Sequence, residues 1–385
     1  MRYEDVYLVA LCIYLIYFLL FRNAEWTEQF IGIAQIAKGG SLGCVIMLWI
    51  GLLLLSDEID WRIPLLFILS SIILFLSYRM NGQYDLFFTV GFCLLSYNVS
   101  AYKIIKTAFW GCLISMLICI SLCALRIVND YKAVFYYGTG HSLGMTHPNM
   151  LAASILSVII SWEIIYNKVA LNTKSIVVFG LTAIIVWNIT KSRTTAYLIV
   201  FFPVILLMVN LLQVLKSEKI LYLVRFALIL LVVGSYFIMV NIKLQSVFSD
   251  GNLRYRFSSA YYLFRKYGIH PFGNSFEYIS TRTAITTGKS TTLLDSAYLY
   301  LLIYCGYMPM IVIMCINIWI ARRCYLLKLY PLLAVFILFI MQGVMEQHML
   351  RVAYNVCYFF AFSNMDLELA TLTLDRDNGL DKLRL

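Results

Sequence analysis

The chain has 385 residues, of which 62% are hydrophobic and 13% are charged. Soluble domains average about 45–50% apolar and about 25% charged residues, so this composition excludes a soluble globular protein, a disordered chain and a disulfide scaffold, and it predicts a polytopic membrane protein. The formal net charge is +10. Because the bases lie between apolar segments, they indicate membrane topology and contact with anionic lipid rather than nucleic acid.

Apolar runs separated by short polar breaks predict an all-α polytopic membrane protein of about twelve transmembrane helices, forming one integral membrane domain over residues 1–385. The predicted spans are 6–21, 40–55, 63–78, 86–101, 107–127, 148–166, 175–190, 196–215, 221–242, 296–320, 329–345 and 352–365. The first run lacks a small-residue cleavage site, so we expect a retained helix instead of a signal peptide. We expect the segment 24–37 to lie at the membrane interface.

The bases of the short loops predict the orientation. If the N-terminus is inside, the inner loops carry 10 Lys/Arg in 32 residues and the outer loops carry 7 in 55. The positive-inside rule then places both termini in the cytoplasm, together with a C-terminal tail over residues 366–385. The longest polar stretch, residues 243–295, is then an extracytoplasmic loop, and loops of this length are usually functional or disordered.

Four motifs bring polar residues to the predicted outer ends of the spans. The first is the run 138–149, Gly-Thr-Gly-His-Ser-Leu-Gly-Met-Thr-His-Pro-Asn, in which Pro148 begins a helix and His147 and Asn149 lie at its mouth. Backbone N–H groups at such a start attract anions. A tight turn capped by Thr146 is the alternative.

The second motif is the short turn 190–195, Thr-Lys-Ser-Arg-Thr-Thr. Its two bases, Lys191 and Arg193, break the positive-inside preference at the outer side. Two explanations are open: the Arg193 guanidinium binds phosphate, or both side chains reach toward lipid headgroups.

The third motif opens in the long loop with Arg254 and runs to the Phe-Gly pair at 272–273. Read as a helix, it places Arg256 on one face with Ala260, and Arg254 and Arg265 on the other. Arg256 therefore points toward the protein and needs an anionic partner, which is either a structural carboxylate or a ligand diphosphate.

The fourth motif is Leu-Asp-Ser-Ala-Tyr-Leu at 294–299, where the long loop re-enters the membrane. Asp295 can act there as a base beside a bound anion. It can equally cap the helix that follows, because Asp is favoured at helix starts.

In this order the four motifs resemble the O-antigen polymerase (Wzy) and O-antigen ligase superfamily, most closely the repeat-unit polymerases of bacterial capsules and exopolysaccharides. The features that carry the resemblance are the His-Pro-Asn helix start, the Ser-Arg turn, a long outer loop that opens with Arg and continues to Tyr-Gly-Ile-x-x-Phe-Gly, and an Asp-x-x-Tyr-Leu helix followed by Gly306. The resemblance covers residues from about 135 to 310.

The resemblance implies a membrane glycosyltransferase of the GT-C type in the bacterial cytoplasmic membrane. Its donor is a growing glycan on undecaprenyl diphosphate, its acceptor is a lipid-linked repeat unit, and the reaction takes place at the outer face. Members work without a metal or a nucleotide sugar, so no cofactor is expected. Membrane lipid, a chain-length regulator and a flippase are the expected partners, and no nucleic acid is expected.

The resemblance also implies roles for residues. The family's leading loop arginine falls on Arg256 and its Ser-Arg arginine on Arg193, so these two are expected to hold the donor diphosphate. Asp295 or His147 is expected to deprotonate the acceptor hydroxyl. Lys191, Asn149, Arg254, Arg265 and Arg282 are the expected further contacts with the diphosphate, lipid or glycan.

Two other functions remain open from the sequence. Ligases of the superfamily carry His-Asn before the helix that follows the long loop, where this chain has Asp295-Ser296, and this difference favours a polymerase over a ligase. A lipid-linked oligosaccharide flippase or other transporter is expected to show two related halves and charges deep in its spans. The chain has no visible halving, and Glu163 is the lone charge within its strongest apolar runs.

Overall fold

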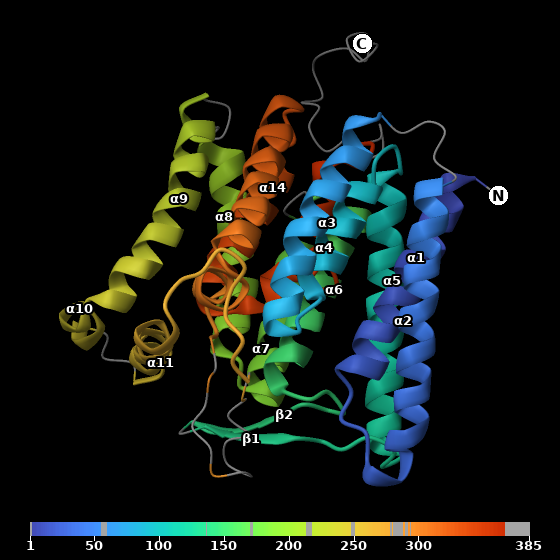
Figure 1. Ribbon diagram of the computed structural model, residues 1–385, viewed down its shortest axis with the longest axis vertical. Helices are drawn as coiled ribbons and strands as arrows, with labels where there is room; N and C mark the ends of the chain where they lie inside the picture. The colour runs from blue at the N-terminus through green and yellow to red at the C-terminus, as the bar shows by residue number, and fades with distance from the viewer. Residues whose placement is uncertain are drawn as a thin grey trace.

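The computed structural model describes residues 2–54, 60–135, 137–169, 172–212, 218–247, 251–277, 279, 288, 292 and 294–365. These residues form a bundle of long helices with one β-hairpin across its lower end (Figure 1). In the described part of the chain, eight helices are long and apolar enough to cross a membrane. The structure therefore agrees with the expected all-α polytopic membrane protein.

The membrane-crossing helices are α1 (Tyr3–Ile16) continued by the π-helical turn η1 (Tyr17–Arg22), α2 (Ile31–Leu54) preceded by the 3-10 turn η2 (Glu28–Phe30), α3 (Arg62–Asn81), α5 (Ala101–Ala124), α6 (Pro148–Tyr166), α7 (Thr173–Thr190), α9 (Glu218–Val240) and α14 (Tyr307–Leu326). Three further apolar helices are shorter over their described side chains: α4 (Asp85–Leu95), α8 (Arg193–Leu212) and α15 (Tyr330–Met345). The segment 24–37, for which the sequence predicts an interfacial position, contains η2 and the first helical turns of α2.

The remaining elements lie outside these spans. They are the strands β1 (Lys132–Phe135) and β2 (Gly138–His141), the helices α10 (Ile242–Val247), α11 (Gly251–Tyr267) and α13 (Ala297–Leu299), and the turns η4 (Tyr300–Cys305), η5 (Gln347–Leu350) and η6 (Val356–Ala361). The expected long loop therefore contains two helices, α10 and α11, in its described part. The expected tail, 366–385, lies outside the described residues.

The expected span 296–320 is not one helix, because the chain breaks at Gly306. Gly306 has φ +99°, and a Cβ there would lie 2.3 Å from the backbone nitrogen of Gly273. The loop after α11 folds back onto this break, where the backbone N–H of Tyr307 donates to the carbonyl of His270 at 3.2 Å. Only glycine fits such a backbone-to-backbone contact, so the spanning helix α14 begins after the break.

The expected span 352–365 is not a continuous α-helix either. Beyond α15 the chain runs from Glu346 to Asn364 through two short 3-10 turns, and nearly all of these residues are buried. Nδ2 of Asn149, at the start of α6, donates to Glu346, and the backbone N–H of Asn364 donates to the carbonyl of Val99 beside the start of α5. The segment thus runs the length of the bundle. Irregular backbone at membrane depth is tolerated only where protein covers it, and the helices around this segment provide that cover.

The two ends of the bundle differ. At one end, here called the terminal end, Glu4 accepts a hydrogen bond from the backbone N–H of Ser100 at 3.2 Å, and Asn364 pairs with the residues on either side of Ser100. The described start and finish of the chain therefore lie together. The β-hairpin covers the opposite end, here called the hairpin end (Figure 1). All four sequence motifs lie at this end.

Candidate functional site

The hairpin is fastened by one carboxylate that precedes it. Oδ1 of Asp130 accepts hydrogen bonds from the backbone N–H groups of Ser142 and Leu143 at 3.0 and 2.9 Å, and Oδ2 lies 2.5 Å from Nδ1 of His141. Burial raises the pKa of Asp130, but the hydrogen bonds from His141 and Leu143 outweigh it, so the pKa is lowered overall. A charged Asp130 thus holds both sides of the hairpin in place.

The hairpin packs directly on the turn between α7 and α8. A Cβ at Gly140 would lie 2.3 Å from the carbonyl oxygen of Thr190, so the glycine in β2 is what allows this contact. Beside it the Tyr137 ring stacks on Trp187 with centroids 5.6 Å apart, and its hydroxyl donates to the carbonyl of Lys191 at 3.2 Å. Gly138 and Gly140, which open the first motif, therefore lie in an ordered strand.

The two bases of this turn lie against aromatic rings. The Arg193 guanidinium carbon is 4.7 Å from the Tyr137 ring centroid, and Nζ of Lys191 is 5.7 Å from the Trp187 ring centroid. Such cation–π contacts hold cations in place at the edge of an apolar region. The turn therefore presents two positive charges beside the hairpin.

The helix start at Pro148 forms as the sequence predicts, but its cap is different. His147 caps α6, with Nδ1 accepting a hydrogen bond from the backbone N–H of Asn149 at 3.1 Å. Thr146, the cap in the alternative interpretation of this motif, donates instead to the sulfur of Met150 at 2.9 Å. The capping contact leaves the proton of a neutral His147 on Nε2.

This arrangement makes His147 a poor base. Burial, followed by the charge of Arg256, lowers the pKa of His147 to about 4. The ring is therefore neutral near pH 7, with its accepting nitrogen already used by the helix cap. Its remaining nitrogen can donate a hydrogen bond to a ligand, but it cannot take up a proton.

Arg256 lies on the packed face of α11, as the sequence predicts. Phe257, Ala260 and Leu263 of the same helix are buried, whereas Arg254 and Arg265 are exposed. Because Arg256 lies on the buried side of α11, its guanidinium points toward the interior of the hairpin end.

Two carboxyl groups meet the Arg256 guanidinium there. Nε lies 3.0 Å from Oδ2 of Asp295, and Nη2 lies 3.6 Å from Oε1 of Glu346. Nη1 donates to the carbonyl of Met345. Asp295 therefore serves as an ion-pair partner, and the start of α13 is formed by Ser296 instead. Of the two anionic partners considered for Arg256, a structural carboxylate or a ligand diphosphate, the structure shows carboxylates of the chain itself.

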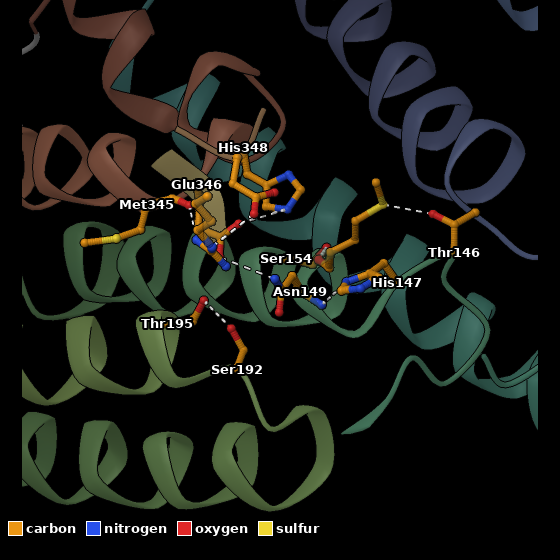
Figure 2. A network of polar contacts seen from close by, with 12 residues as sticks. Thr146, His147, Asn149, Ser154, Ser192, Thr195, Met345, Glu346 and His348 are labelled. Atoms are coloured by element: carbon orange, nitrogen blue, oxygen red, sulfur yellow. Dashed lines mark hydrogen bonds and ion pairs between the residues drawn. The ribbon is translucent and has the colours of Figure 1, made fainter. Parts of the chain in front are cut away.

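Glu346 joins this ion pair to the start of α6. Its Oε1 accepts a hydrogen bond from Nδ2 of Asn149 at 3.3 Å, and its Oε2 lies 3.8 Å from Nε2 of His348. Figure 2 shows Glu346 between these two side chains, which come from opposite sides of the site. We call Arg256, Asp295, Glu346, Asn149 and His348 the Glu346 cluster.

The two carboxyl groups of this cluster do not ionise independently. Burial raises the pKa of Asp295, against the attraction of Arg256. For Glu346, burial raises the pKa, Arg256 lowers it and Asp295 raises it again, with a net value of about 7. Two carboxyl groups that share one guanidinium titrate as a pair. A proton can therefore be held or released here near neutral pH.

A second buried ion cluster lies nearby, built around Asp85. Nε of Arg351 lies 3.0 Å from Oδ2 of Asp85, and Nη1 of Arg22 contacts Oδ1. The side chains of Arg22, Asp85 and Arg351 are 16%, 6% and 12% exposed. Two guanidinium groups share one carboxylate, so this Asp85 cluster carries one excess positive charge.

Part of the Arg351 guanidinium in the Asp85 cluster makes no hydrogen bond within the described residues. Nη1 of Arg351 is buried, and it has no hydrogen-bond partner among the described residues. His348, three residues before Arg351, links the two clusters. Burial lowers its pKa well below the usual value, and the charges of Arg351 and Arg256 add to this effect. Two polar clusters thus lie side by side at the hairpin end, one close to neutral and one positive.

The structure brings together most of the residues singled out in the sequence. His147, Asn149, Arg256 and Asp295 lie in or beside the Glu346 cluster, and Lys191 and Arg193 lie in the neighbouring turn. Tyr137 connects the two groups, because it contacts Arg193 and interacts electrostatically with Arg256. Arg254 and Arg265 point away from the cluster. Arg282 lies outside the described residues.

The motifs are linked by residues that the sequence did not single out, namely Arg22, Asp85, Glu346, His348 and Arg351. One signal was present: the break between the last two apolar runs is Glu-Gln-His-Met-Leu-Arg, with three ionisable side chains in six residues. In the sequence alone, a short break of this kind cannot be distinguished from an ordinary loop between two spans.

Comparisons of the chain with protein-family models, with curated proteins and with solved structures find no match. Within the described ranges, no three His, Cys, Asp or Glu side chains are grouped so that they could hold a metal ion.

Proposed function

We propose that the chain is a polysaccharide polymerase of the bacterial cytoplasmic membrane. In this proposal it joins oligosaccharide repeat units carried on undecaprenyl diphosphate at the outer face, during synthesis of capsule, exopolysaccharide or O-antigen. The hairpin end is then the outer end. The observation that carries the proposal is the Glu346 cluster, in which Arg256, Asp295 and Asn149 of three separate motifs meet around one buried carboxyl group.

The chemistry of glycosyl transfer fits this cluster. The acceptor hydroxyl attacks the anomeric carbon of the donor, the bond from that carbon to the diphosphate oxygen breaks, and the diphosphate leaves with the bonding electrons. The proton of the hydroxyl needs a base whose pKa lies near the working pH. Glu346, with its pKa of about 7, supplies that base, and Asp295 shares the Arg256 guanidinium with it.

Arg256 has a different role in this proposal from the one the resemblance implied. Its guanidinium is already met by two carboxyl groups, so it has little positive charge to offer a diphosphate. Its contacts instead hold Asp295 and Glu346 in place, which makes Arg256 a positioning residue. His147 and Asn149 then donate hydrogen bonds toward the saccharide.

In this proposal, cations outside the Glu346 cluster offset the negative charge of the leaving diphosphate. The Asp85 cluster carries one excess positive charge, and the nearby turn adds Lys191 and Arg193. Guanidinium groups held in a region of low dielectric stabilise developing negative charge more strongly than they do in water. We therefore place the diphosphate between Arg351 and the turn, with Arg22 supporting Arg351 through Asp85.

Reconstitution tests this proposal. The purified full chain in liposomes is given an undecaprenyl-diphosphate-linked oligosaccharide, and the products are sized. The proposal predicts a ladder of lengthening glycans, lost in Glu346→Gln and kept in Glu163→Gln, which removes a buried carboxyl from the α6–α7 contact. A ladder that Glu346→Gln leaves intact contradicts the assigned base, and no ladder with several such donors contradicts the activity.

A further inference from the structure

A groove runs along the outside of the bundle between α1 and α5, far from the Glu346 cluster. It has a volume of 470 Å³. The α1 wall is made by Leu8, Cys12 and Ile16, which repeat every four residues and so share one face of the helix. Trp110 and Ile114 of α5 form the other wall. The lining is therefore almost entirely apolar over most of its length.

The groove opens toward the membrane. Trp110, Ile114 and Ile16 are 44%, 50% and 36% exposed, although each belongs to a helix that is long and apolar enough to cross a membrane. Water does not fill an apolar groove at this depth, because it finds no hydrogen-bond partners there. A hydrocarbon chain matches the lining.

Two lysines mark one end of the groove. Lys103 and Lys106 belong to its lining and lie in the first two turns of α5. Nζ of Lys103 is 2.7 Å from Oε2 of Glu4, which places the lysines at the terminal end. Nζ of Lys106 lies 6.0 Å from the Tyr102 ring centroid, and within the described ranges no carboxylate pairs with it. One carboxylate thus faces two ammonium groups, which leaves a positive charge at the mouth of an apolar groove.

We propose that this groove is a binding site for one anionic phospholipid. An acyl chain lies between α1 and α5, and the phosphate lies against Lys106 and Lys103. Basic residues at the ends of grooves between transmembrane helices select anionic headgroups in this way. The proposal does not depend on the proposed polymerase activity. It places the lipid headgroup at the bundle end opposite the Glu346 cluster.

The test measures thermal unfolding of the purified full chain in detergent, with added phosphatidylglycerol or phosphatidylcholine of the same acyl chains. A ligand that binds only the folded state raises the unfolding temperature. We expect a larger rise with phosphatidylglycerol. The double variant Lys103→Gln with Lys106→Gln is expected to respond equally to both lipids. Lys174→Gln removes a lysine from the start of a different helix, α7, and is expected to behave as wild type.

A second variant tests the groove itself. Ile114→Trp places a larger side chain in the groove at a half-exposed position, so the fold tolerates it while the acyl chain loses its space. We expect this variant to lose the response to phosphatidylglycerol. Equal responses of the wild-type chain to both lipids overturn the proposal, and so does a phosphatidylglycerol preference that survives both variants. A full response to glycerol phosphate alone also overturns it, because that molecule has no chain to occupy the groove.

Discussion

Nδ2 of Asn149 donates a hydrogen bond to Oε1 of Glu346 at 3.3 Å, although the two residues are 197 positions apart in the sequence. This bond joins the first turn of α6 to the irregular segment that follows α15. The same Oε1 faces the Arg256 guanidinium of α11. One carboxyl group thus connects three parts of the chain, and the following predictions test its consequences.

Stability should depend on pH through Glu346. Its pKa is raised to about 7 by burial, against Arg256 and with Asp295, whereas an unfolded Glu titrates near 4.3. The folded state therefore binds more protons between these values, so stability is lost as the pH rises through this window. We expect the unfolding temperature of the wild-type chain to fall as the pH rises from about 4.5 to above 7, and Glu346→Gln to weaken this fall. An unchanged pH profile in the variant contradicts the assignment.

Removal of the Arg256 guanidinium should cost stability as well as activity. Loss of one partner from a buried ion pair costs about 3–5 kcal/mol, and Arg256→Met leaves both Asp295 and Glu346 without their cation. We expect a loss near the lower end of that range, because Arg256 is 23% exposed. Adding Asp295→Asn and Glu346→Gln should recover stability but not glycan synthesis. Lys266→Ala, at an exposed position of the same helix, should change neither.

The hairpin should separate from the α7–α8 turn when Gly140 gains a side chain. In Gly140→Ala the new Cβ would meet the carbonyl of Thr190 at 2.3 Å, and overpacking of this kind costs about 1–3 kcal/mol. Gly180→Ala is the matched control, because a Cβ at that helical position has no atom within 4 Å. We expect the unfolding temperature to fall in the first variant only. Equal unfolding temperatures would mean that the hairpin does not pack on the turn.

The Asp85 cluster should be sensitive to loss of its one carboxylate. Asp85→Asn leaves Arg22 and Arg351 buried together without a counter-charge, and we expect a loss of about 3–5 kcal/mol in the free energy of unfolding. Adding Arg351→Met should recover part of this loss. In the exposed pair Arg2–Asp5, Asp5→Asn should cost less than about 1 kcal/mol. Similar losses in the two Asp→Asn variants would contradict a buried, net-positive cluster.

The fold was predictable from the sequence for helices whose apolar pattern depends only on the helix itself. Apolar runs with short breaks predicted helices such as α5, α6 and α7. The helical periodicity of α11 correctly predicted that Arg256 lies on the packed face of that helix. The prediction of continuous spans was wrong at 296–320, where Gly306 meets Gly273, and at 352–365. Both cases depend on packing between distant segments, which a hydropathy pattern does not contain.

The candidate site was predictable to a similar degree. His147, Asn149, Arg256 and Asp295 belong to motifs with local order, and the structure brings them together. Glu346 and the Asp85 cluster were missed because their importance depends on contacts between residues that are far apart in the sequence. Arg351 and Asp85, for example, are 266 positions apart. A carboxylate beside an apolar run looks the same in the sequence whether it pairs with water or with a buried arginine.

The central claim is that the Glu346 cluster is the active centre of a glycan polymerase, and the most direct measurement is made in the native host. The gene is deleted, and the sizes of surface glycan and lipid-linked intermediates are compared after complementation with wild type, Glu346→Gln or Glu163→Gln at matched membrane levels. We predict single lipid-linked repeat units without long polymer in the deletion and in Glu346→Gln, and full polymer with wild type and Glu163→Gln. Long polymer made by Glu346→Gln, or by the deletion strain itself, would contradict the account.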